Sequence, residues 1–332
     1  MSSTSLLPSS TERAFDPSTV IDHPSGFFAL SPRNQRFTVN GIDGFVAYRE
    51  QGKHLIAFGG VHAVPPDQER LLDAFLAHAE SRRRRVLVVQ LRARQIGLFL
   101  DRGFTVNQFG TSFGLTLRRF SMAGSAKMRL RNKISRARKA GIRIVEVGRD
   151  VPRDETAFAR LRAVSDQWLR RKGKELDFMI GEIGAPEDAL RRIFMALDPS
   201  GSPVGFITYV PAWGRAPGYL HDLTRRLPTA PAGAMELCNA HAIDRMTADG
   251  VEHLHFGFTP FITDAAELPG ANRLASWLVR QLRKRGSVLY PAETQAQYKL
   301  KWAPDLVERE YIAARPISLR SVFDLMILTR SI

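Results

Sequence analysis

The chain has 332 residues, 44% of them hydrophobic, a length that predicts two domains whose cores need no disulfide staples. Lys and Arg exceed Asp and Glu by 48 to 33, and this net charge of +15 predicts an anionic partner: nucleic acid, an anionic membrane or a phosphorylated ligand. The alternative that this charge only keeps the protein soluble stays open. The single cysteine, Cys238, excludes an internal disulfide and favours a reducing compartment.

The apolar segments argue against secretion and membrane spanning. Residues 1–20 are expected to be flexible, and their Ser, Thr and Pro content contains no basic segment followed by an apolar run, as a signal peptide would. No stretch reaches the ~18 apolar residues of a membrane span. We therefore expect a cytoplasmic protein, with peripheral contact to an anionic membrane as an open option.

The first predicted unit, residues 21–123, alternates short strands with amphipathic helices. Strands are expected at 44–49, 54–59, 86–91 and 109–117, and helices at 66–82 and 94–102. Gly103 follows the second helix and is expected to cap its C-terminus. This order predicts a mixed α/β unit.

The second predicted unit, residues 142–332, repeats a similar order of elements. Strands are expected at 142–147, 204–210, 219–223 and 251–258, and helices at 154–171, 234–248 and 271–285. The similarity hints at a duplication. The apolar segment 317–332, which contains Arg320 and Arg330, is expected to dock on the core, with contact to a membrane as the alternative.

A strongly basic helix is predicted between the two units, at 124–141. Leu130, Ile134 and Ala137 recur at helical spacing and form one apolar stripe. The rest of the helix carries seven bases and no acid: Lys127, Arg129, Arg131, Lys133, Arg136, Arg138 and Lys139. Like charges on a helix repel, and phosphates or anionic headgroups would turn that repulsion into binding. We favour an anion-binding surface over a merely solvated helix.

Two further segments combine charged residues with strand-like patterns. In 221–226 (His-Asp-Leu-Thr-Arg-Arg), Asp222 could hold an ammonium group, and Arg225 and Arg226 could bind phosphate or carboxylate. A structural ion pair at a strand end explains the segment equally well. In 298–304, strand alternation would put Lys299 and Lys301 on one face, either toward phosphates or as a guard on an edge strand.

Several other chemistries find no support in the sequence. His253 and His255 would share a strand face, but they have no convincing further ligands, so we predict no metal and no cofactor. Cys238 sits among apolar helix residues and is expected in the core. The nucleophile elbow, the Walker phosphate loop and the dinucleotide fingerprint are missing.

The order of these segments resembles the C-terminal catalytic region of phosphatidylglycerol lysyltransferases, the multiple peptide resistance factor family. The resemblance spans roughly residues 25–315 and rests on 99–104 with Gly110, the basic helix, 168–178 with Gly173-Lys174-Glu175, 221–234, 256–260 and 298–304. Residues 231–233 read Pro-Ala-Gly where the family commonly has Pro-Asn-Gly, and 59–61 read Gly-Gly-Val where Gly-Asp-Pro is common.

The resemblance implies tandem GNAT-like acyltransferase domains of the α/β class, joined by the basic helix. It implies aminoacyl-tRNA as the donor and a lipid or small molecule as the acceptor. It places Asp222, Arg225 and Lys299 in the catalytic site and the basic helix against tRNA or lipid headgroups. Substrate-binding candidates are Arg226, Lys301, Glu236 and Thr259.

The expected activity is transfer of an amino acid to a hydroxyl or amine. An aminoacyl ester is already activated, so the enzyme has only to align the acceptor and stabilise an oxyanion. Two alternatives stay open. An acyl-CoA-dependent N-acyltransferase would share the fold, although the chain lacks the usual Gly-rich pyrophosphate loop. A non-catalytic RNA-binding protein would use the same positive charge.

Overall fold

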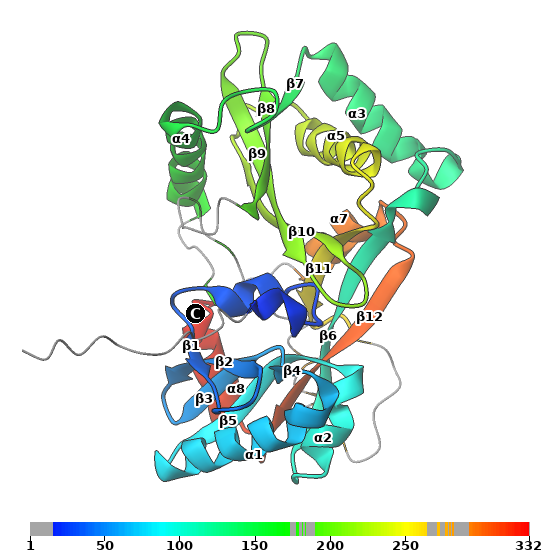
Figure 1. Cartoon of the computed structure of the whole chain (residues 1–332). Helices are drawn as coiled ribbons and strands as arrows, with labels where there is room; N and C mark the ends of the chain where they lie inside the picture. The colour runs from blue at the N-terminus through cyan, green and yellow to red at the C-terminus, as the bar shows by residue number, and fades with distance from the viewer. Residues whose placement is uncertain are drawn as a thin grey trace, which may run out of the picture.

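One mixed sheet runs through the whole molecule (Figure 1). The computed structural model describes residues 16–172, 177–178, 181, 183, 190–263, 271–272, 276–277, 279, 281 and 292–331. Within these residues the strand order is β1 (Gln35–Phe37), β2 (Gly44–Gln51), β3 (His54–Phe58), β5 (Arg85–Arg92), β12 (Leu306–Ala314), β6 (Thr105–Thr116), β11 (His253–Pro260), β10 (Gly218–Arg226), β9 (Pro203–Ala212), β8 (Arg192–Leu197) and β7 (Arg143–Glu146), with β4 (His62–Ala63) paired to β2.

The two halves of the sheet repeat one plan. In the first half an antiparallel run leads to β3, which pairs in parallel with β5 after the crossover helix α1 (Pro65–Ser81). In the second half an antiparallel run leads to β10, which pairs in parallel with β11 after the crossover helix α5 (Ala234–Ala248). The predicted α/β class with two units in tandem is confirmed.

Alternating side chains cover both faces of the first half. On β5, Val86 and Val88 join the cluster that contains Phe75 of α1. Leu87 and Val89 point to the other face and join the cluster that contains Leu325 of α8 (Leu319–Leu328). The uninterrupted apolar run of β5 reflects this burial on both sides. The short helix α2 (Ile96–Leu100) packs beside β6.

Two helices cover opposite faces of the second half (Figure 1). Helix α4 (Glu155–Lys172) packs on one face and α5 on the other. The basic helix, α3 (Met128–Lys139), lies against α5. Its predicted apolar stripe of Leu130, Ile134 and Ala137 is buried, as expected. Five of its bases are exposed and Arg131 is partly buried, as is Lys127, which directly precedes the helix.

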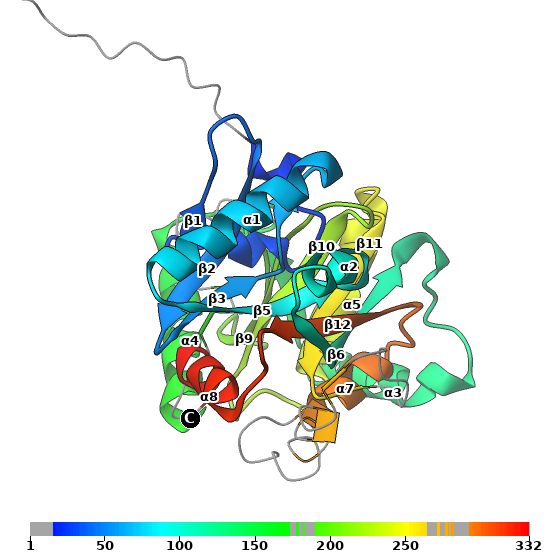
Figure 2. The ribbon, with the colours of Figure 1, turned by 90° about the horizontal axis from the view of Figure 1, so that it is seen from below.

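The C-terminal residues pack on the first half of the sheet. Strand β12 lies between β5 and β6, and α8 lies over β2 and β3 (Figures 1 and 2). The expectation that 317–332 docks on the core is therefore confirmed for α8. The domain ranges 21–123 and 142–332 stay predictions, although β12 pairs with two strands of the first range, β5 and β6, and α8 packs on two others, β2 and β3.

One predicted strand is wrong, and others were missed. Residues 292–300 form helix α7 (Ala292–Leu300), so Lys299 and Lys301 do not share a strand face. The alternating apolar and basic residues lie in the last turn of this helix and just beyond it. Trp302, which follows the helix, is buried in the core. Strands β1, β8 and β12 were not predicted, and the helix expected at 271–285 lies largely outside the described residues.

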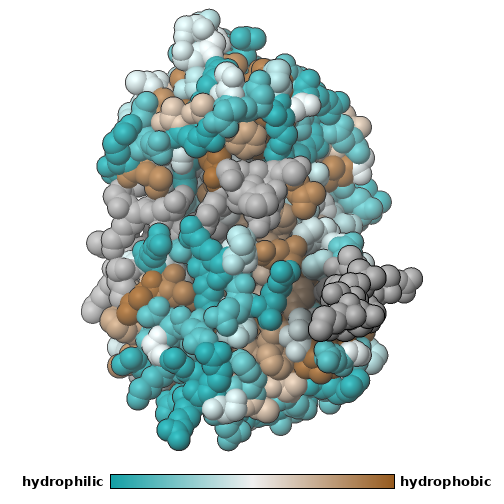
Figure 3. Space-filling model, turned by 60° about the vertical axis from the view of Figure 1, so that its left-hand side comes forward, coloured by the Kyte–Doolittle hydropathy of each residue, from teal (hydrophilic) through white to brown (hydrophobic). Residues whose placement is uncertain are grey.

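The surface has scattered apolar patches. None of the described helices is both long and apolar enough to cross a bilayer. Figure 3 shows one face of the molecule as largely hydrophilic, interrupted by apolar areas. Cys238, by contrast, is fully buried in the core of the second half, as predicted.

Helices α3 and α5 approach so closely at Gly233 that no side chain fits there. Gly233 has a φ of 93°, and a Cβ at this position would lie 2.0 Å from the Lys133 carbonyl oxygen. Gly250, at the other end of α5, has a φ of 75° and open space around it. We expect Gly250→Ala to lower the free energy of unfolding by roughly 1–2 kcal/mol through backbone strain alone. Gly233→Ala should cost about 2 kcal/mol more, because the two helices must move apart.

Urea denaturation of the two variants measures this difference. Equal losses of stability in the two variants would contradict the close contact between α3 and α5.

Candidate active site

The parallel strands β10 and β11 separate after only three paired residues. Gly218–Leu220 pair with His253–His255, after which β10 continues along β9 and β11 continues along β6. Both strands are irregular where they part, between His221 and Thr224 and between His255 and Gly257. Gly257 adopts a φ of 72°, which favours glycine. We call this separation the strand split.

A cavity of about 470 Å³ opens at the strand split. Its walls come from both halves of the molecule and include residues of β5, β6, β10, β11, α4, α7, α8 and the short helix η2 (Gly26–Leu30). The apolar lining includes Phe28, Phe109, Leu220, Phe256, Phe258, Phe261, Leu325 and Met326. The charged lining includes Asp177, Asp222, Arg225 and Lys299. The three predicted catalytic residues therefore meet at one cavity.

Lys299 projects from α7 as a buried amine. Its Nζ donates to the carbonyl oxygens of Gly257 at 2.9 Å and Phe258 at 2.8 Å. Burial lowers the pKa of Lys299 to about 7, although the carboxylate of Glu310 opposes the shift. Near neutral pH the side chain therefore exchanges between the ammonium and the amine, and the ammonium is a donor suited to developing negative charge.

Asp222 is held in a buried ion pair. Its side chain is 1% exposed, and Oδ2 accepts from Arg191 Nη1. The backbone N–H of Gly181 donates to Oδ1 at 3.0 Å, and Thr208 Oγ1 lies 3.4 Å from Oδ2. The structural ion pair considered for this segment is thus formed, with Arg191 as its partner, at a residue that also lines the cavity.

Arg225 and His221 extend the polar wall of β10. The guanidinium carbon of Arg225 lies 4.0 Å from the ring centroid of Trp168, a cation–π contact that keeps the charge buried beside the cavity. His221 Nε2 lies 2.7 Å from Thr224 Oγ1. Burial, with the charges of Lys299 and Lys301, lowers the pKa of His221 to about 3, so this imidazole is neutral at physiological pH.

The four predicted substrate-binding residues do not line the cavity. Arg226 is exposed at the end of β10, and Thr259 is fully buried, with no hydrogen-bond partner for its hydroxyl among the described residues. Lys301 Nζ lies 2.7 Å from Glu236 Oε1, which also receives Lys133 Nζ at 3.3 Å. Burial favours a higher pKa for Glu236, but these two lysines outweigh it and lower the pKa. Glu236 therefore ties α3 to the end of α7.

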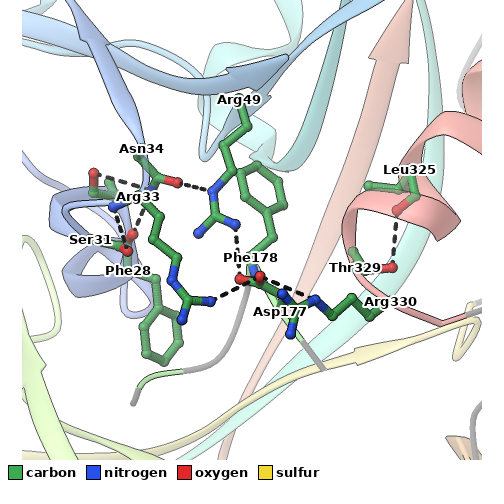
Figure 4. Close-up of polar contacts among 11 residues, drawn as sticks. Phe28, Ser31, Arg33, Asn34, Arg49, Asp177, Phe178, Leu325, Thr329 and Arg330 are labelled. Carbon is green, nitrogen blue, oxygen red and sulfur yellow. Dashed lines mark hydrogen bonds and ion pairs between the residues drawn. The ribbon is translucent and has the colours of Figure 1, made fainter. Parts of the chain in front are cut away.

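Three arginines converge on Asp177 at the edge of the cavity (Figure 4). Arg49 Nη1 and Arg33 Nη1 donate to its carboxylate at 2.8 Å and 3.0 Å, and Arg330 Nε lies 3.6 Å away. Asn34 Oδ1 accepts from Arg49 Nε at 2.7 Å and fixes that side chain. Burial favours a higher pKa for Asp177, but the arginines outweigh it and lower the pKa. Three cations around one anion leave this edge positive.

Sequence reasoning missed several lining residues and their partners. Trp168 and Asp177 line the cavity and lie in the segment 168–178 that supported the resemblance. An aromatic and an acidic residue in that segment could have indicated two more site residues. The central motif of that segment, residues 173–175, lies outside the described residues. Arg191 precedes the unpredicted strand β8, and no sequence pattern links it to Asp222.

His253 and His255, the two histidines expected to share a strand face, contact the carbonyl oxygens of Pro217 and Ala216.

Several named proteins are similar to this chain in sequence. "Lysylphosphatidylglycerol biosynthesis bifunctional protein LysX" of Mycobacterium tuberculosis is 28% identical over 216 residues, which is 64% of this chain and 18% of the relative. The protein of the same name in Mycobacterium ulcerans is 24% identical over 287 residues, 84% of this chain and 26% of the relative. The chain thus spans only about a fifth to a quarter of the length of these relatives.

Solved structures share its fold. L-PGS from Bacillus licheniformis superposes with a TM-score of 0.74 at 21% identity, covering 93% of this chain and 92% of that one. A C-terminal domain from Agrobacterium fabrum gives a TM-score of 0.77 at 20% identity, covering 97% and 96%. A family model described as "Phosphatidylglycerol lysyltransferase, C-terminal" matches residues 14–314, so this chain belongs to the phosphatidylglycerol lysyltransferase C-terminal family.

Proposed function

We propose that this protein transfers an amino acid from aminoacyl-tRNA to a hydroxyl group of a lipid of the phosphatidylglycerol type. The observation that carries the proposal is the apolar cavity at the strand split, with the buried amine of Lys299 in its wall, in a member of this family. Relatives of this chain are named for lysylphosphatidylglycerol biosynthesis. We place the protein in the cytoplasm, where charged tRNA is available.

The reaction needs alignment more than a reactive enzyme group. The acceptor oxygen attacks the ester carbonyl carbon, the bond from that carbon to the tRNA oxygen breaks, and the acceptor proton ends on the tRNA oxygen. No covalent enzyme intermediate and no cofactor are required, because the donor ester is already activated. The ammonium form of Lys299 is suited to stabilise the oxyanion that develops on the carbonyl oxygen.

The charged side chains of β10 are suited to hold the donor. Asp222 would attract the ammonium group of the aminoacyl moiety, and Arg225, fixed on Trp168, would meet phosphates near the tRNA end. The eight apolar lining residues named above suit acyl chains better than a polar soluble acceptor. These features favour a lipid over a small molecule.

The exposed bases of α3 are suited to contact the tRNA backbone. Arg129, Lys133, Arg136, Arg138 and Lys139 are exposed on a helix that has no acidic residue. Lys133 and Lys301 share Glu236, so α3 is linked to the end of the helix that carries Lys299. A phosphate backbone lying along α3 would relieve the repulsion among these charges.

A transfer assay tests the function. Purified protein is mixed with radiolabelled aminoacyl-tRNA and vesicles containing phosphatidylglycerol, and we expect label to enter the organic phase unless RNase is added first. Label that leaves tRNA for an aqueous product would replace the lipid acceptor. Turnover of acyl-CoA, or binding of tRNA without any transfer, would overturn the proposal in favour of one of the two alternative activities.

Variants of Asp222 connect the assay to the site. Asp222→Ala should abolish transfer, but it also breaks the buried ion pair with Arg191, which costs roughly 3–5 kcal/mol of stability. The double variant Asp222→Ala with Arg191→Met removes both charges and should recover most of that stability. If the stable double variant transferred at the wild-type rate, Asp222 would have no role in the reaction.

The charge on Lys299 predicts a pH dependence. Lys299→Met removes an oxyanion donor and should slow single-turnover transfer by about 100-fold at about pH 6. Since the wild-type ammonium loses its proton as the pH rises through about 7, the ratio of wild-type to variant rates should fall above that pH. Titration of the donor and acceptor affects both proteins and cancels in this ratio. A ratio that rises with pH would indicate that Lys299 acts as a base instead.

The tRNA contact predicts a change in salt dependence. The triple variant Arg129→Gln, Arg136→Gln and Arg138→Gln should lower the slope of log affinity for tRNA against log salt by about 2. The triple variant Arg36→Gln, Arg83→Gln and Arg85→Gln removes the same charge from exposed sites on the first half and should leave the slope nearly unchanged. Equal slopes for the two triple variants would show that only net charge attracts tRNA.

A further inference from the structure

The outer face of α8 is apolar and basic. From residue 319 to residue 330, the exposed residues are Leu319, Arg320, Phe323, Ile327 and Arg330. Leu319, Phe323 and Ile327 are 70%, 49% and 37% exposed and recur every four residues, so they form one stripe along the helix. A helix on a protein surface normally turns polar residues to water, so this stripe requires an explanation.

The other face of α8 is already committed to the core. Ser318 and Ser321 form a capping box at the start of the helix, and Leu325 is buried in the core of the first half. Asp324 Oδ2 lies 2.6 Å from His54 Nδ1 and accepts from the backbone N–H of Lys53 at 3.2 Å. The helix cannot roll to bury its apolar stripe without breaking these contacts.

The charges around the stripe are positive. Arg320 and Arg330 flank it, and Arg33 is paired with Asp177 close to Arg330. Two acids of the described residues near the stripe are paired: Asp324 is 2% exposed and bound to His54 and Arg320, and Asp177 is shared by three arginines (Figure 4). An apolar stripe with a basic border complements an anionic bilayer, whose headgroups attract arginine and whose acyl region accepts leucine and phenylalanine.

The stripe also lies next to the cavity. Leu325, Met326 and Thr329 of α8 line the cavity, as does Ser331 just beyond it. Figure 2 shows α8 in red at the lower left of the molecule, and Figure 3 shows apolar areas within the hydrophilic surface. One side of this helix therefore borders the cavity while another faces solvent.

We propose that the outer face of α8 docks on the surface of an anionic lipid bilayer and brings the cavity to the membrane. Leu319, Phe323 and Ile327 enter the boundary between headgroups and acyl chains, while Arg320, Arg330 and Arg33 contact lipid phosphates. A lipid acceptor then reaches the cavity beside α8 without leaving the bilayer completely. This inference rests on the proposed lipid acceptor for its purpose, but the docking is measured without any transfer.

A fluorescent probe on the stripe tests the contact directly. Cys238 is the single cysteine of the chain and is buried, so Phe323→Cys adds the one accessible thiol. An environment-sensitive dye on that thiol should shift to the blue when vesicles of phosphatidylglycerol and phosphatidylcholine are added. The same dye on Val64→Cys, an exposed site at the start of α1, should not respond. Equal responses at the two sites, or none at either, would overturn the proposal.

Matched sets of substitutions test its energetic basis. Leu319→Ser, Phe323→Ser and Ile327→Ser together should weaken vesicle binding about 1,000-fold, at about tenfold for each side chain. Val64→Ser, Leu100→Ser and Val307→Ser remove three exposed apolar side chains elsewhere and should leave binding within about threefold. Arg320→Gln with Arg330→Gln should weaken binding about fivefold per arginine, and only to vesicles that contain the anionic lipid. Thermal melting checks that every variant is folded.

Other occupants of the stripe give different results. If the stripe binds a second copy of this chain, sedimentation will show a dimer that the α8 triple variant dissociates, and vesicle binding will not change; that result overturns the proposal. Transfer to a short-chain, water-soluble phosphatidylglycerol separates docking from function. The α8 triple variant should keep this activity and lose transfer to vesicles. If the wild type binds vesicles through α8 but transfers to neither acceptor, the proposed function fails and the docking stands.

Discussion

The separation of β10 from β11 after three paired residues is the constraint on which the site depends. Beyond Leu220 and His255, β10 no longer pairs with β11, and the carbonyl groups of Gly257 and Phe258 face a helix instead of a strand. Buried carbonyl groups need donors, and Lys299 Nζ supplies them to both. The same burial lowers the pKa of Lys299 to about 7. A gap in the sheet therefore creates the cavity and places an amine of neutral pKa in its wall.

The gap is tolerated because the rest of the sheet is continuous. Strand β12 returns from the C-terminus to lie between β5 and β6, and β6 pairs with both β12 and β11, so the two halves share one hydrogen-bonded ladder. Glu310 of β12 is fully buried there, and burial raises its pKa to about 7 against the opposing charge of Arg92. Its carboxylate in turn favours the charged form of Lys299. The inserted strand thus joins the two halves of the sheet by hydrogen bonds and also supplies the carboxylate that favours the charged form of Lys299.

Most of the fold was predictable from local patterns, whereas the site depended on contacts between distant residues. Buried strands such as β5 and amphipathic helices such as α1 and α3 reveal themselves through periodicity, and the apolar stripe of α3 was located to the residue. The segment after residue 297 was mistaken for a strand because alternation over five residues also fits one helical turn. The Asp222–Arg191 pair joins two loosely related segments, and the insertion of β12 between β5 and β6 follows from the packing of the whole chain.

The basic helix and the C-terminal helix give the molecule two charged surfaces of different character. Helix α3 exposes arginine and lysine without large apolar neighbours beyond Met128, as suits a hydrated phosphate backbone, whereas α8 mixes arginine with leucine, isoleucine and phenylalanine, as suits a lipid interface. In Figures 1 and 2 the two helices lie on opposite sides of α7, which carries Lys299. A large polyanion on α3 and a bilayer against α8 would therefore not compete for one surface. Because the cavity between them is lined from both halves, a donor and an acceptor arriving from opposite sides would meet at the strand split.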